Sequence, residues 1–162
     1  MSHSIRPVLL GIALAIITIS PASYALCWES GEGPTAIYRH PTVAAEFKEA
    51  TFVITGRVTA GRNISEPDDP EGYAWTVYTV QVLENYKGTP PRMIQLVSEN
   101  TSARFWMDVG KTYLLFVSHS STVEMAGQES LPMDYIDNCG NSAAVEDAEH
   151  ALKKVRSLSK IR

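Results

Sequence analysis

The chain has 162 residues, of which 44% are hydrophobic and 20% are charged, and its formal net charge is −4. This acidity, with no basic run outside the last predicted helix, argues against nucleic acid as a partner. A chain of this size can bury one adequate hydrophobic core, so we expect a single domain after any leader segment.

The first 25 residues have the three parts of a cleavable secretory signal peptide. Arg6 lies in a short polar start, residues 8–19 are apolar, and small residues lead up to Ala25. The apolar stretch is shorter than the roughly 20 residues that a transmembrane helix needs. We therefore predict cleavage after Ala25, a secreted or periplasmic mature chain of residues 26–162, and no membrane span after cleavage. An uncleaved anchor is the alternative.

Both cysteines, Cys27 and Cys139, belong to the exported part of the chain. An even number of cysteines in an oxidising compartment favours a disulfide, and two cysteines allow one pairing. The bond would close a loop of nearly the whole domain, which the chain-entropy model credits with about 4–5 kcal/mol. We expect it to tie the two ends of the domain together.

The first half of the exported chain reads as a loop, a short helix and a strand. Residues 28–34 are rich in helix and strand breakers, and a helix is predicted over 43–49 with Thr42 as its cap. Alternating apolar residues predict a strand over 51–58, in which Gly56 indicates a bulge or a closely approached backbone. A polar loop over 62–72 follows, and its acids Glu66, Asp68 and Asp69 are interpreted as solvated rather than as calcium ligands.

The second half is richer in strands and ends in a helix. Residues 113–117 are apolar on both faces, which is typical of a central strand. Apolar residues at steps of three and four over 145–158 predict a terminal amphipathic helix capped by Asn141 or Ser142. The helix dipole accounts for its basic end without a membrane or an acidic partner. The strands predicted here cover 73–86, 93–98, 105–107, 111–118 and 131–136.

These elements predict a mainly β fold class. A five- to six-stranded antiparallel Greek-key barrel of the OB-fold type, with a short N-terminal helix and a C-terminal amphipathic helix, accounts best for their order.

The sequence carries no pattern of catalytic or metal-binding residues. Its four histidines are scattered, without a His-Glu-x-x-His motif or a glycine-rich phosphate loop. His119 lies among serines, but neighbours in sequence do not make a catalytic triad, and we interpret it as a solvated residue at a strand end. We therefore predict a binding or structural module rather than an enzyme, with no catalytic residue, no metal site and no cofactor.

Five segments in order resemble those of a netrin-like module, and among such modules the tissue inhibitors of metalloproteinases are the most similar. The resemblance covers nearly all of the mature chain and implies an OB-type five-stranded barrel flanked by helices. It is carried by Cys27 before a short helix, residues 50–58, residues 78–88, residues 109–116, and Cys139-Gly140 before the last helix.

The chain departs from those inhibitors at its mature N-terminus. The family begins with Cys-x-Cys, whose first cysteine chelates the zinc of the protease, and here Ala25 stands at that first position. The usual partner of that cysteine would fall near Ser102 or Ala103, which are not cysteines either. The resemblance thus implies a lead-in without the rigid chelating residue, and rigid presentation is what makes such binding tight.

Three functions from different classes remain open. The first is a binding module that contacts a protein partner, in its boldest form a metalloprotease, through Leu26, Cys27, Trp28 and Glu29. The second is a structural envelope or extracellular protein without a specific partner. The third is a glycan binder, which Trp75 or Trp106 would report by fluorescence.

Intact mass and N-terminal sequencing of the exported protein, before and after reduction and alkylation, test the predicted processing. We expect the chain to begin at Leu26 and to gain two alkyl groups only after reduction, because Cys27 and Cys139 are bonded. An uncut terminus, or two thiols that react without reduction, would contradict the predicted export and the disulfide.

Overall fold

The computed structural model describes residues 40–101, 104–123 and 131–161. This part of the chain is mainly β, as predicted, with a short helix before the strands and a longer one after them. The elements are α1 Val43–Glu49, β1 Phe52–Ser65, β2 Tyr73–Lys87, β3 Met93–Glu99, β4 Thr112–Val123, β5 Leu131–Ile136, β6 Ala143–Ala144 and α2 Glu149–Ser159.

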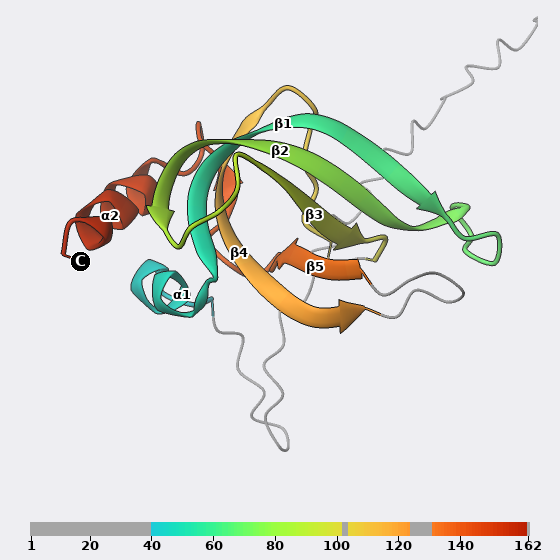
Figure 1. Cartoon of the computed structure of the whole chain (residues 1–162), viewed down its shortest axis with the longest axis horizontal. Helices are drawn as coiled ribbons and strands as arrows, with labels where there is room; N and C mark the ends of the chain where they lie inside the picture. Colours follow the sequence, from blue (N-terminus) through green and yellow to red (C-terminus); the bar gives the residue numbers. More distant parts are fainter. Residues whose placement is uncertain (1–39, 102–103, 124–130, 162) are drawn as a thin grey trace, which may run out of the picture.

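Five strands close into a barrel (Figure 1). Their hydrogen-bonded order is β1-β2-β3-β5-β4, the ring closes because β1 also pairs with β4, and β6 extends the sheet beside β4. Every pair is antiparallel except β3 and β5, which run parallel. The predicted OB-fold-like barrel with flanking helices is thereby confirmed.

Gly56 lets β1 bend into this ring, as its place in the sequence predicted. The pairing of β1 with β2 shifts register between Thr55 and Gly56. A Cβ atom on Gly56 would collide with the side chain of Val80 and lie 3.3 Å from the carbonyl oxygen of Gln81. A larger residue at this position would push β1 and β2 apart.

The strands β1 and β4 have two apolar faces because each lies between two cores. Leu115 and Val117 of β4 point into the barrel, whereas Leu114 and Phe116 point toward the helices. The helices supply Phe47, Leu152 and Val155 to that second core. This arrangement confirms the central position predicted for residues 113–117.

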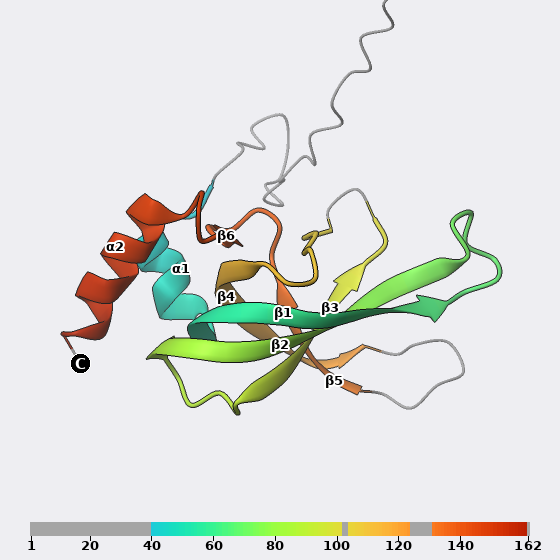
Figure 2. The same cartoon turned by 90° about the horizontal axis from the view of Figure 1, so that it is seen from above.

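The two helices pack together at one end of the barrel, and the β1–β2 hairpin projects from the opposite end (Figures 1 and 2). Lys87 fastens the first helix, since its ammonium group donates hydrogen bonds to the carbonyl oxygens of Lys48 and Ala50 at the end of α1. The helical end is therefore fixed to β2 as well as to β4.

Three predictions in the strand region are wrong, and one of them is the end of β4, which runs to Val123 instead of residue 118. The strand β1 continues to Ser65, so the hairpin loop is limited to 66–72, because Ile64 is buried against Val77 on β2. Residues 105–107 form no strand. Tyrosine hydroxyls hold that segment instead: Tyr78 accepts from the backbone N–H of Met107 at 3.5 Å, and Tyr113 accepts from that of Asp108 at 2.8 Å.

The predicted caps of the last helix are also wrong. The helix α2 begins at Glu149, and its N-cap residue Ala148 makes no capping bond through its side chain. The backbone of residues 143–144 pairs with β4 as β6. A turn over residues 145–147 then separates this strand from the start of the helix. Ser142 is used elsewhere, because its hydroxyl accepts a hydrogen bond from the backbone N–H of Phe116 at 2.9 Å.

Asn141, the other predicted cap, joins the segment after β5 to the first helix. Its backbone N–H and its side-chain amide each donate to the same carboxylate oxygen of Glu46, both at 2.6 Å. The amide also donates to the carbonyl oxygen of Pro41 at 2.9 Å. Gly140 permits this approach, since a Cβ atom there would collide with the carboxylate.

Glu46 makes the stability of the fold depend on pH. Burial raises the pKa of its carboxyl group, and the two hydrogen bonds from Asn141 offset part of that rise. A folded-state pKa above the unfolded value contributes stability that is present at low pH and lost as the pH rises through the folded pKa. Ionisation of this buried carboxyl group therefore carries a cost in desolvation.

We expect Glu46→Gln to remove this pH dependence. The free energy of unfolding of the wild type, relative to the variant, should fall as the pH rises from about 4 to about 7, because the wild type loses the contribution of the protonated carboxyl group. Urea unfolding at a series of pH values measures it. Glu49→Gln, on the exposed face of the same helix, controls for the loss of one negative charge, and parallel profiles for wild type and Glu46→Gln would refute the prediction.

Candidate binding cleft

The residues that the sequence predicted for partner binding, Leu26, Cys27, Trp28 and Glu29, lie outside the described residues. Cys139 lies just beyond β5 and is half-buried, and no cysteine within the described ranges is free. The bond between Cys27 and Cys139 stays a prediction.

A cleft of about 450 Å³ opens in the barrel wall between β3 and β5. These two strands pair at Leu96 with Asp134 and at Val97 with Tyr135, and the cleft begins where this short ladder ends. A volume of this size accommodates a small ligand or a few side chains of a partner. The wall beside the parallel pair thus has an opening large enough to admit another molecule.

Side chains from both faces of the wall line the cleft. Ile136 belongs to the barrel core, and Ser98 shares the inner face with the core residue Leu96 two positions earlier. The outer face contributes Val97 and Tyr135, which are cross-strand neighbours, and Trp75 of β2 lies beside them. The cleft thus has an aromatic outer rim and reaches toward the apolar interior.

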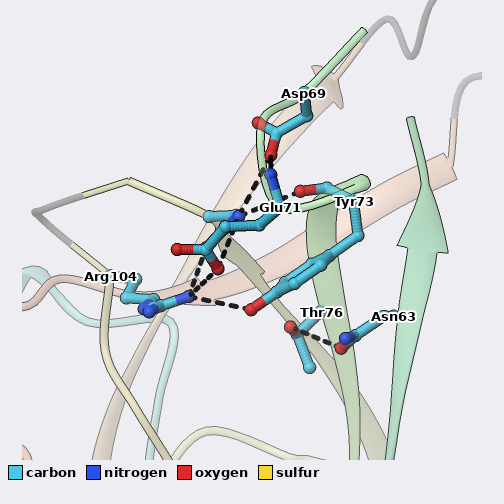
Figure 3. A network of polar contacts seen from close by, with 7 residues as sticks. Asn63, Asp69, Glu71, Tyr73, Thr76 and Arg104 are labelled. Carbon is cyan, nitrogen blue, oxygen red and sulfur yellow. Dashed lines mark hydrogen bonds and ion pairs between the residues drawn. The ribbon is translucent and has the colours of Figure 1, made fainter. Parts of the chain in front are cut away.

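The rim is held in shape by a polar network around Arg104 (Figure 3). The guanidinium group donates to the hydroxyl of Tyr73 at 3.1 Å and to the side-chain oxygen of Asn100. It also lies 3.9 Å from a carboxylate oxygen of Glu71, and its central carbon stands 4.5 Å from the ring centroid of Trp106. Four groups therefore share the one cationic side chain.

The acidic hairpin loop takes part in the same network rather than being merely solvated. Asp69 accepts a hydrogen bond from the backbone N–H of Glu71 at 2.8 Å, which shapes the turn (Figure 3). Asn100 donates to the carbonyl oxygen of Tyr73 at 3.0 Å and to the carboxylate of Glu71 at 3.3 Å. The loop is tied to the segment after β3, next to the cleft.

The two other charged residues that line the cleft are the carboxylates Glu99 and Asp137. One oxygen of Asp137 accepts a hydrogen bond from the backbone N–H of Cys139 at 2.8 Å. Both residues are exposed, and neither forms an ion pair within the described part of the chain.

His119 was predicted to lie at a strand end, but β4 continues beyond it to Val123, so this histidine lies within the strand, where its side chain is exposed and bonded. Its Nδ1 atom lies 2.7 Å from a carboxylate oxygen of Asp134 on the neighbouring strand β5. Across residues 40–101, 104–123 and 131–161, no three His, Cys, Asp or Glu side chains come together as metal ligands would. Neither helix of these ranges is long and apolar enough to cross a membrane.

Most of the cleft was not predicted from the sequence. Trp75 was named as a reporter of glycan binding, but Glu99, Arg104, Tyr135 and Asp137 were not singled out. They are brought together by the pairing of β3 with β5, two strands that are more than 30 residues apart in the chain. No local motif marks such a pairing.

No protein-family model and no curated protein sequence matches this chain. The resemblance to netrin-like modules therefore stays an expectation, and the function has to be inferred from the cleft itself.

Replacing Arg104 with Met tests how firmly the network holds the rim. We expect the free energy of unfolding to fall by about 1–2 kcal/mol, since hydrogen bonds to a mostly shielded cation are lost. The emission of Trp106 should change as well, because the guanidinium group leaves its ring. Arg62→Met, an exposed arginine on β1, is the matched control, and equal effects of both substitutions would show that the network adds nothing.

Proposed function

We propose that this chain is an exported, non-catalytic binding module of the netrin-like type that holds a segment of a protein partner in the cleft between β3 and β5. The observation that carries this proposal is the cleft itself, an opening in the barrel wall with an aromatic rim. The module would require no cofactor and no metal of its own.

Aromatic side chains are the residues that contribute most to protein interfaces. Trp75 and Tyr135 stand at the outer rim, and Phe105 lines the cleft from the loop before β4. Phe105 is itself braced by Tyr113, whose ring meets it edge to face with the centroids 6.1 Å apart. Braced rings lose little conformational entropy when a partner binds, which favours affinity.

The lead-in predicted for partner binding is compatible with the same surface. The predicted disulfide would tie Cys27 to Cys139, which directly follows the cleft-lining residues Asp137 and Asn138. Bonded cysteines have Cα atoms within about 7 Å of each other. Leu26, Trp28 and Glu29 would then belong to the neighbourhood of the cleft, so one partner could contact both.

Inhibition of a metalloprotease is the narrowest form of this function and rests on the resemblance to the inhibitor family. A panel of zinc proteases incubated with excess mature protein tests it directly. Undiminished activity of every protease would remove this form and leave the binding module standing.

The proposal predicts a partner whose capture depends on the cleft. Immobilised mature protein should retain one stoichiometric protein from its native envelope or secretion medium, and Tyr135→Ala should weaken that retention by about tenfold or more, as truncation of an aromatic anchor does. Leu83→Ala removes an exposed apolar side chain of similar accessibility from β2 and serves as the control.

Two outcomes would replace the proposal by its alternatives. Absence of any stoichiometric partner would favour a structural protein of the envelope or extracellular space. Retention of glycans, with a change in the emission of Trp75, would favour a glycan binder, for which the aromatic rim is also suited.

A further inference from the structure

The charged side chains around the cleft differ in how many contacts with other charged, polar or aromatic groups of the chain they already make. Arg104 shares its guanidinium group among Tyr73, Asn100, Glu71 and the ring of Trp106. Its side chain is 29% exposed. Glu99 and Asp137 are exposed and have no ion pair within the described ranges. The charge that the cleft can offer to a ligand is therefore negative.

The two carboxylates occupy matching positions on the two sides of the opening. The β3–β5 ladder ends at Val97 and Tyr135, and Glu99 and Asp137 each follow two residues later on their own side. Side chains two residues apart along a strand share a face, so Glu99 belongs to the outer face, as Val97 does. Asp137 follows the end of β5 and lines the same cleft, so the β3 side and the β5 side each contribute one carboxylate.

Aromatic side chains line the same cleft as the two carboxylates. Trp75 is the direct cross-strand partner of Glu99 on β2, and such partners have Cβ atoms about 5 Å apart. Tyr135 precedes Asp137 by two residues and is 41% exposed. Carboxylates and aromatic faces both attract a cation and both repel or ignore an anion. All four side chains thus favour a cationic ligand.

We propose that the cleft receives a lysine or arginine side chain from an extended segment of the partner, between Glu99 and Asp137 and against Trp75 and Tyr135. This inference rests on the proposed function and adds the chemistry of the bound segment. The net charge of −4 on the whole chain supports it, because an acidic protein attracts basic partners over distance.

Short capped peptides with one variable central residue test the inference on the full mature protein. The peptides alternate Ser and Thr and carry Lys, Arg, norleucine or Glu at the centre, so that charge changes while length is kept. Binding is followed by the indole signal of Trp75 in two-dimensional NMR. We expect the Lys and Arg peptides to bind about tenfold more tightly than the norleucine peptide, and the Glu peptide to bind least.

A double variant distinguishes the effect of the two negative charges from the effect of a changed fold. Glu99→Gln with Asp137→Asn keeps the shape of both side chains, and the new amide oxygen at 137 can still accept the bond from the backbone of Cys139. This variant should lose the preference for Lys and Arg over norleucine. Asp68→Asn with Glu146→Gln removes two exposed charges elsewhere and should keep the preference.

The outcomes distinguish this inference from the proposed function. Equal binding of all four peptides, or a preference that survives in the double variant, would overturn the cationic site and leave a protein-binding cleft. Failure of every peptide to bind, with glycans perturbing Trp75 instead, would overturn both.

Discussion

The number of strands in the barrel is the constraint on which the rest of the structure depends. A closed ring of five strands cannot have every neighbouring pair antiparallel, because directions that alternate around a ring require an even number. One pair must run parallel, and here it is β3 with β5. Parallel strands cannot be joined by a tight hairpin and pair somewhat less stably for each residue. The ladder between them extends over two residue pairs, and the wall of the barrel opens where it ends. The cleft is thus a consequence of ring closure.

One short segment connects this opening to the helical end of the molecule. Asp137 lines the cleft, its backbone oxygen accepts from Gly140 at 3.1 Å, and Asn141 bonds to Glu46 on α1. Cys139 lies between them. The same run of chain therefore carries a carboxylate of the cleft, the cysteine predicted to tie the lead-in, and the contact that fixes the first helix. A change in the position of one of these three should therefore displace the other two, because they share one short run of backbone. Glu46 holds this junction in place by accepting two hydrogen bonds from Asn141.

The sequence was sufficient for the elements whose signals are local. The alternation over residues 51–58, the cap at Thr42 and the apolar run of β4 over 113–117 are set by neighbouring residues, and each was predicted. The errors have a common cause in distant contacts. Tyr78, on β2, bonds to the backbone of Met107 from 29 residues away, and the pairing of β6 with β4 delays the last helix. Glu99 and Asp137 line one cleft for the same reason, because β3 pairs with the distant strand β5. Nothing near either residue in the chain distinguishes it from an ordinary surface acid.

The preference for a cationic side chain that we infer for the cleft depends on Arg104, which need not touch the ligand. With Arg104 free, one cation and two carboxylates would line the opening, and an acidic or neutral segment could bind beside the guanidinium group. The network of Tyr73, Asn100 and Glu71 engages that cation at the rim, and the ring of Trp106 covers one of its faces. What is left for an incoming side chain is negative charge and aromatic surface. Specificity in such a site depends on the lack of a group that attracts acidic ligands as much as on the presence of groups that attract basic ones. The acidic hairpin loop, by supplying Glu71, would then help to select a ligand that it does not contact.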